Sequence, residues 1–316
     1  MTGAVRWAYP SGIPTDKGTI VTVGTFDGVH RGHWAVLDEI RERARATDRR
    51  SVLVTFDPHP LRIVRPEHAP PLLTTPIEKK EILAESGLEY AVFIAFTETL
   101  SRYTPRRFVE EILVDRLHVD ELVIGYDHGF GHDRSGNADT LREIGTELGF
   151  AVDVVAPVEA GEEAVSSTRI RTAVAEGRMD EARLCLGRPY SIRGVVVRGD
   201  GRGKRLGFPT ANLEMSATDK LVPPAGIYAV CGVLKQGTFI GALHLGPRPT
   251  FAGSLPSVEL HLLDFEGEIY GESVRVDFVQ YLRPVLPFGN VQALIEQMRV
   301  DVELARRVVD EDPSFT

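Results

Sequence analysis

Two histidines lie three residues apart in a glycine-rich segment, Gly24-Thr-Phe-Asp-Gly-Val-His-Arg-Gly-His33. An apolar run over 19–23 precedes this segment, and a helical pattern follows it. Such a strand–turn–helix unit gathers free backbone N–H groups at the positive end of a helix dipole, where phosphate binds. His30 and His33 would project to one side of that helix start. We predict a nucleotide-phosphate site with both imidazoles aimed at the reacting phosphorus. On spacing alone, an incidental histidine pair is an equally open interpretation.

The composition narrows the class of protein. A length of 316 residues suits two domains, and 43% apolar with 26% charged residues is ordinary for a soluble protein. The net charge of -9 argues against nucleic-acid binding. No secretory signal or membrane-length apolar run is found, so no membrane association is expected. Cys185 and Cys231 suggest no disulfide framework, which fits a cytoplasmic location. The oligomeric state stays open, a homo-oligomer included.

The first half of the chain alternates short apolar runs with helical patterns. The expected strands are 19–24, 51–56, 90–95, 121–125 and 151–156. The expected helices lie near 33–46, 77–86, 105–117 and 138–148. This order predicts an α/β domain with a doubly wound parallel sheet, which binds ligands beyond the carboxyl ends of its strands.

The second half has a different pattern. Strand-like runs without helices between them are expected at 191–198, 226–234, 238–245, 257–265 and 273–281. They predict an all-β antiparallel sheet or small barrel, followed by an amphipathic helix over 290–309 with Leu294, Met298 and Val302 on one face. Residues 168–186 read as helical, and we place the domain boundary at 186, giving domains 1–186 and 187–316.

Three further stretches each have a structural and a functional interpretation. Ser166-Ser-Thr-Arg-Ile-Arg171 can cap a helix or bind a polyphosphate, and alone it favours capping. The segment Gly201–Asn212 is a basic hairpin loop, or a flap over ATP with Thr210 offering a hydroxyl to Mg²⁺. Glu259, in an expected strand, is a solvent-facing carboxylate or a general base for a substrate hydroxyl.

Together these stretches resemble the bacterial bifunctional riboflavin kinase/FAD synthetases. The resemblance runs from about residue 18 to the C-terminal helix. It rests on seven ordered motifs: Gly24–His33, Phe56-Asp-Pro-His-Pro60, Ser166–Arg171, Leu186-Gly-Arg-Pro-Tyr190, Gly207-Phe-Pro-Thr-Ala-Asn212, Pro249-Thr-Phe251, and Glu259 through Tyr270-Gly271.

The family implies two transferase reactions. An N-terminal nucleotidyltransferase domain of the HxGH type converts FMN and ATP to FAD and pyrophosphate, and a C-terminal β-barrel kinase converts riboflavin and ATP to FMN and ADP. The resemblance gives His30, His33 and Glu259 catalytic roles, with Glu259 as the base. The implied ATP and phosphate contacts are Gly24, Phe26, Asp27, Gly32, Ser167, Thr168, Arg171, Gly201, Gly203, Lys204, Gly207, Pro209 and Asn212. The implied flavin contacts are Asp57, Pro58, Asp127 and Phe208, and Thr210 with Asn212 would organise Mg²⁺.

Two positions depart from the family pattern. Gly129 stands where we expect an arginine, and His244 stands where we expect an asparagine. The first departure leaves open a riboflavin kinase whose adenylyltransferase half has decayed. A non-catalytic flavin sensor is a further alternative, although binding alone does not require His30, His33 or Glu259.

Overall fold

The chain folds into two compact units, Met1–Ser167 and Thr168–Thr316. The computed structural model describes residues 5–8, 12–126, 136–199, 201–215, 217–246 and 257–312. Residues 168–186, which we assigned to the first domain, group with the second unit. The functional boundary at 186 stays a prediction.

The first unit is built on a parallel sheet with the strand order β1-β4-β3-β2-β5-β6. Its strands are β1 (Arg6–Ala8), β2 (Thr19–Val23), β3 (Arg50–Asp57), β4 (Tyr90–Ala95), β5 (Val119–Gly125) and β6 (Ala151–Val155). The chain runs outward from β2 to β4 and then returns to β5 on the other side of β2. The carboxyl end of β2 therefore lies at the switch point where open sheets bind ligands.

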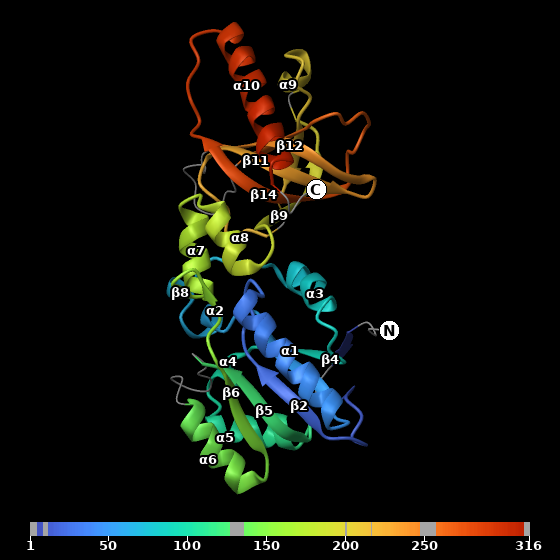
Figure 1. Cartoon of the computed structure of the whole chain (residues 1–316), viewed down its shortest axis with the longest axis vertical. Helices are drawn as coiled ribbons and strands as arrows, with labels where there is room; N and C mark the ends of the chain where they lie inside the picture. Colours follow the sequence, from blue (N-terminus) through green and yellow to red (C-terminus); the bar gives the residue numbers. More distant parts are fainter. Residues whose placement is uncertain are drawn as a thin grey trace. The chain divides into compact units, whose positions relative to one another are not determined.

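Alternate side chains of the central strands enter two separate cores. Ile20 packs with one set of helices, whereas its neighbour Val21 packs with the other, as the period-two geometry of a strand requires. The first set is α1 (Arg31–Ala46) and α3 (Pro76–Ala84); the second is α5 (Pro105–Phe108), η3 (Val109–Val114) and α6 (Ala138–Leu148). The predicted doubly wound α/β domain is confirmed (Figure 1).

Short elements that the hydrophobic pattern did not indicate connect these layers. They are α2 (Leu61–Val64), η2 (Pro66–His68), α4 (Glu98–Ser101), β7 (Glu159–Ala160) and β8 (Glu163–Ala164). None exceeds four residues, so none carries a recognisable period.

The second unit begins with two helices and continues into a closed antiparallel barrel of order β10-β13-β12-β11-β14-β9. The helices are α7 (Ser167–Ala175) and α8 (Met179–Leu186). The strands are β9 (Ser191–Val197), β10 (Ala211–Glu214), β11 (Gly226–Leu234), β12 (Gly237–Leu245), β13 (Val258–Leu262) and β14 (Ser273–Arg283). The predicted barrel is confirmed.

The expectation of no helix among the barrel strands is wrong. A single helical turn, α9 (Arg202–Arg205), precedes β10. The N–H groups of Leu206 and Phe208 both donate to the Gly203 carbonyl, at 3.0 and 2.9 Å, which ends this turn. Because α9 has no apolar face of its own, the sequence pattern could not distinguish it from a loop.

The terminal helix α10 (Val291–Asp310) packs against β11, β12 and β14 (Figure 1). Ala305 and Val309 enter a cluster with Ala229, Cys231 and Val279 of the barrel. The predicted face of Leu294, Met298 and Val302 is only half-buried, because Asp301 takes the buried position beside it.

Asp301 forms a paired ionic contact that fastens α10 to the barrel. Arg283 Nε and Nη2 donate to its two carboxylate oxygens at 2.8 and 2.6 Å, and the Asp301 side chain is 7% exposed. We expect Asp301→Ala to lower the free energy of unfolding by about 3–5 kcal/mol, because it leaves a buried guanidinium without its charge partner. Urea unfolding of the full chain measures this.

The matched control for Asp301→Ala is Arg306→Ala on the same helix. It removes the exposed pair between Arg306 and Asp264, which should contribute less than about 1 kcal/mol. Equal effects of the two variants would contradict the assignment of Asp301 as an anchor.

Candidate functional site

His30 and His33 form a stacked pair at the start of α1. Their ring centroids are 3.6 Å apart with an interplanar angle of 15°. The His33 N–H donates to Nδ1 of His30 at 3.3 Å, and the His30 N–H donates to Nδ1 of His33 at 3.2 Å. The two imidazoles thus form a capping box at the start of the helix, in which each ring accepts the backbone N–H of the other residue. A Ser or Thr and a Glu usually form this motif.

This reciprocal cap determines where each imidazole carries its proton. A ring whose Nδ1 accepts an N–H bond carries its hydrogen on Nε2. Both histidines therefore present an Nε2–H donor on the side away from the cap. Two donors of this kind beside a helix N-terminus are suited to phosphate oxygens. The phosphate site itself stays a prediction.

The turn between β2 and α1 is strained. Phe26 and Val29 have positive φ angles of 47° and 38°, although neither is glycine. Such conformations cost about 1–3 kcal/mol each and persist only where the surroundings require them. Both side chains are buried, and the Phe26 ring packs 4.6 Å from the His33 ring. Gly24 leaves room for that ring, since a Cβ there would approach it to 2.9 Å.

The carboxylate of Asp27 binds a second segment to this turn. It accepts the N–H groups of Leu73 and Thr74, each at 3.0 Å, and the Thr74 hydroxyl at 3.2 Å. The same hydroxyl oxygen accepts the Gly28 N–H at 3.0 Å. Asp27 is 1% exposed, so its carboxylate stabilises the turn as a buried hydrogen-bond acceptor. Its contact with ATP stays a prediction. Sequence reasoning missed Thr74.

Lys79 of α3 also reaches this turn. Its Nζ donates to the Thr25 carbonyl at 2.7 Å, and the Thr55 hydroxyl donates to the same oxygen at 3.0 Å. Burial lowers the pKa of Lys79, while the charges of Asp27 and Asp57 act in the opposite direction. Sequence reasoning missed this residue too, because a lysine in a helix carries no signal of burial.

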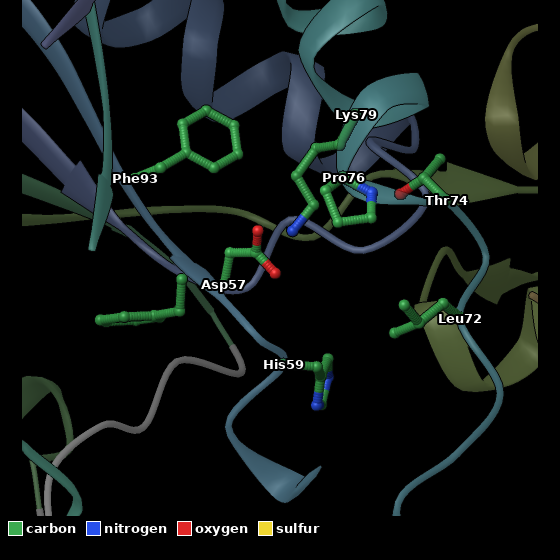
Figure 2. A pocket seen from close by; sticks show the side chains of 8 residues that line it. Asp57, His59, Leu72, Thr74, Pro76, Lys79 and Phe93 are labelled. Atoms are coloured by element: carbon green, nitrogen blue, oxygen red, sulfur yellow. The ribbon is translucent and has the colours of Figure 1, made fainter. Parts of the chain in front are cut away.

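A small hollow, partly open to solvent, lies beside Lys79. Figure 2 shows the ammonium group of Lys79 facing the carboxylate of Asp57 across it. The lining residues are Phe56, Asp57, His59, Leu72, Thr74, Pro76, Lys79 and Phe93. The expected flavin contact Asp57 thus lines a cavity at the carboxyl end of β3; Pro58 follows it as an exposed residue.

The other residues expected at this site fall into three groups. Ser167 donates its hydroxyl hydrogen to the Asp27 carbonyl at 3.0 Å, which brings it to the histidine turn. Thr168 and Arg171 lie on α7 in the second unit, and their contact with pyrophosphate stays a prediction. Asp127 and the departure at Gly129 lie outside the described residues.

Gly32 provides a sensitive test of the histidine pair. A Cβ at this position would lie 3.2 Å from Nδ1 of His30, so the ring must move by a few tenths of an ångström. We expect Gly32→Ala to slow FAD formation about tenfold, because small misplacements of positioning groups are costly. Alanine favours a helix over glycine by up to ~1 kcal/mol, so the variant should remain folded.

Steady-state rates of FAD formation from FMN and ATP measure the effect of Gly32→Ala. The control is phosphorylation of riboflavin by the same preparation, which should be unchanged. An unaltered rate of FAD formation would contradict the close approach of Gly32 to His30.

In the barrel, three polar residues form a row across neighbouring strands. Asn212 of β10 pairs with Glu259 of β13, and Glu259 pairs with His244 of β12. Residues directly opposite in register share one face of the sheet. Glu259 Oε1 lies 3.8 Å from His244 Nδ1, and both side chains are more than a third exposed. The departure at His244 therefore adds an imidazole beside the expected base.

The loop before β10 packs beside this row of polar residues. The imidazole of His261, two residues after Glu259, makes a 2.7 Å contact between its Nδ1 and the Pro209 carbonyl. The Phe208 ring packs edge-on against the same imidazole, with centroids 5.6 Å apart. The expected flavin contact Phe208 and the expected ATP contact Pro209 thus lie beside Glu259.

Two glycines shape this loop. Gly207 has a φ of 89°, which favours glycine. A Cβ at Gly203 would lie 2.3 Å from the Phe208 carbonyl oxygen and 2.9 Å from the Thr210 hydroxyl, so the backbone approaches closely there. Gly201 also has a positive φ, and Lys204 lies within α9.

The barrel offers oxygen donors suited to a hard cation. Within the described ranges, no group of three or more histidine, cysteine or acidic residues could hold a metal ion. Mg²⁺ needs few protein ligands when it is bound with a nucleotide. The hydroxyl of Thr210 and the amide oxygen of Asn212 fit that requirement, and Gly199 accommodates the amide, since a Cβ there would lie 2.1 Å from Asn212 Nδ2.

Both halves of the chain match known protein families. The sequence model of the FAD synthetase family matches residues 13–169, and that of riboflavin kinase matches residues 186–309. The chain is 36% identical over 294 residues to the bifunctional riboflavin kinase/FMN adenylyltransferase of Listeria monocytogenes, covering 92% of this chain and 93% of the relative. The chain belongs to the bifunctional riboflavin kinase/FMN adenylyltransferase family. The enzyme of the same name from Pseudomonas fluorescens is 38% identical over 294 residues, covering 93% and 94% of the two chains.

A solved structure shares the fold of this family member over nearly its whole length. The crystal structure of a macrolide-efflux protein from Streptococcus pneumoniae matches with a TM-score of 0.86 and 29% identity, covering 96% of this chain and 99% of that one. No helix in the described part of this riboflavin kinase/FMN adenylyltransferase family member is long and apolar enough to cross a membrane.

Proposed function

We propose that this chain phosphorylates riboflavin to FMN with ATP and then adenylylates FMN with a second ATP, giving FAD and pyrophosphate. The observation that supports the proposal is the presence of two separate sets of polar groups in one chain. The stacked imidazoles of His30 and His33 serve the adenylyl transfer, and the row of Asn212 and Glu259 serves the kinase.

In the adenylyl transfer, an FMN phosphate oxygen attacks the α-phosphorus of ATP. That bond forms while the bond to the bridging oxygen of the β-phosphate breaks, and pyrophosphate leaves. No protein nucleophile is needed, so catalysis depends on positioning and charge stabilisation. The Nε2–H groups of His30 and His33 donate to the phosphate oxygens as their charge grows. Ser167, Thr168 and Arg171 contact the departing pyrophosphate.

In the kinase, Glu259 accepts the proton of the terminal ribityl hydroxyl as that oxygen bonds to the γ-phosphorus of ATP. The bond from this phosphorus to the β–γ bridging oxygen breaks at the same time, and ADP leaves. Asp performs the role of the base in protein kinases. The Glu259 side chain is 39% exposed, so a substrate hydroxyl can reach it. Thr210 and Asn212 would bind Mg²⁺, which supplies charge neutralisation to the ATP phosphates. Gly201, Gly203, Lys204, Gly207 and Pro209 form the phosphate flap, and Phe208 contacts the flavin.

The division into an adenylyltransferase module at 1–186 and a kinase module at 187–316 is part of this proposal, as is a cytoplasmic location. The flavin contacts of Asp57, Pro58 and Asp127 belong to it as well. The pocket at Asp57 supports the first of these contacts.

A chromatographic time course with riboflavin, ATP and Mg²⁺ tests the proposal. We expect FMN to appear first and then to convert to FAD. FMN that accumulates without FAD would restrict the function to the kinase and implicate Gly129. Bound flavin without any turnover would replace the enzyme with a flavin sensor.

A further inference from the structure

Lys79 is a buried cation that the two reactions as described do not use. Its side chain lies at the junction of the histidine turn and the adjoining pocket. The residue is 7% exposed, and its Nζ donates to the Thr25 carbonyl at 2.7 Å. Burying an ammonium group is unfavourable unless nearby groups compensate it. The compensation comes from Asp27 below the turn and Asp57 across the pocket.

The same three charges determine the electrostatics of the pocket. Two carboxylates beside a phosphate site would repel both of the anionic substrates. Because Lys79 interacts with both carboxylates, the local charge is one unit less negative. The ammonium group of Lys79 also lines the pocket, where it can attract an incoming anion. Like charges disfavour binding, and a cation in a water-poor site acts more strongly than one in solvent.

We propose that Lys79 is a positioning residue of the adenylyltransferase: it fixes the Thr25 carbonyl and offsets Asp27 and Asp57, so that the pocket admits a phosphate monoester. This inference rests on the proposed adenylyl transfer. It assigns the discrimination for a phosphorylated flavin to the pocket of Asp57, Thr74 and Lys79.

Two variants separate the contributions of Lys79. Lys79→Gln keeps an N–H donor for Thr25 and removes the charge, whereas Lys79→Met removes both. We expect kcat/KM for FMN to fall about 100-fold in Lys79→Met, since removing a buried cation that interacts with two carboxylates is costly. In Lys79→Gln the loss should reside mainly in the KM for FMN. Lys235→Met, at an exposed lysine in the turn between β11 and β12, is the control and should leave both parameters unchanged.

A third variant distinguishes charge balance from a purely structural role. Asp57→Asn in the Lys79→Gln background restores the charge of the pocket. We expect this double variant to lose less affinity for FMN than the sum of the losses in its two single variants, so that the two substitutions are not additive. A structural role through Thr25 alone would give additive effects, which would overturn the proposal. Normal kinetics of Lys79→Gln toward FMN would overturn it as well.

Each outcome of these experiments has a separate meaning. Wild-type protein that makes no FAD from FMN and ATP would reject the adenylyltransferase itself. Active wild type with an unaffected Lys79→Gln would reject only the role of Lys79. Circular dichroism of the full chain identifies a variant that fails to fold, and Lys79→Gln remains informative if Lys79→Met is unstable.

Discussion

Glu259→Gln should abolish the formation of FMN while leaving the conversion of supplied FMN to FAD unchanged. Glutamine has the shape of glutamate but cannot take a proton from the ribityl hydroxyl. General-base catalysis contributes about 10²–10⁴-fold, so we expect kcat of riboflavin phosphorylation to fall by that factor. Glu259 lies opposite Asn212 on one face of the barrel sheet, whereas its neighbours Val258 and Leu260 are buried on the other face. The substitution therefore leaves those buried side chains in place.

The measurement is the rate of each half-reaction in one preparation of Glu259→Gln. FAD formation from FMN and ATP is the internal control for intact protein. Glu303→Gln, which alters an exposed glutamate of α10, is the matched control and should phosphorylate riboflavin normally. FMN production by Glu259→Gln at a rate near that of wild type would refute the assignment of the base.

Replacing His30 and His33 should produce the opposite result. Loss of one preorganised donor to a developing oxyanion costs about 10²–10³-fold in rate, so the double alanine variant should make almost no FAD. Riboflavin phosphorylation should continue unchanged. The variant also loses its reciprocal helix cap, which costs only about 1 kcal/mol of stability, much less than the expected effect on the barrier.

A second pair of substitutions separates capping from catalysis. The double variant His30→Ser with His33→Glu creates an ordinary capping box, because both side chains carry an oxygen that can accept a backbone N–H and neither carries an N–H donor. It should therefore preserve the helix start and remove both Nε2–H donors. We expect wild-type thermal stability together with the same loss of FAD formation as the alanine variant. Retention of FAD formation would mean that the rings matter only as caps.

The central strands of the sheet and the longer strands of the barrel were predictable from sequence because each buries an apolar run. β1 was missed, since its three residues Arg6–Ala8 carry no period and pair only with β4. β10 was missed for a similar reason. Its sequence Ala-Asn-Leu-Glu has little strand character, and its hydrogen-bond partners lie on β9 and β13, far along the chain.

The candidate site was predictable only where its residues are neighbours in sequence. The spacing of His30 and His33 indicated that both reach one group, and the alternation in β13 placed Glu259 opposite Val258 and Leu260, as the structure has it. Thr74 and Lys79 could not be predicted. They meet the turn across 46 and 54 residues of chain, and no local pattern encodes a contact of that length.

The dependence of the histidine turn on a remote segment bears on protein design. The strained backbone at Phe26 and Val29 is stabilised by Asp27, which binds the segment at Leu73 and Thr74. A graft of Gly24–His33 onto another strand and helix would transfer both imidazoles without the residues that impose their geometry. The smallest segment that could carry this histidine turn into another protein therefore runs from β2 through α3.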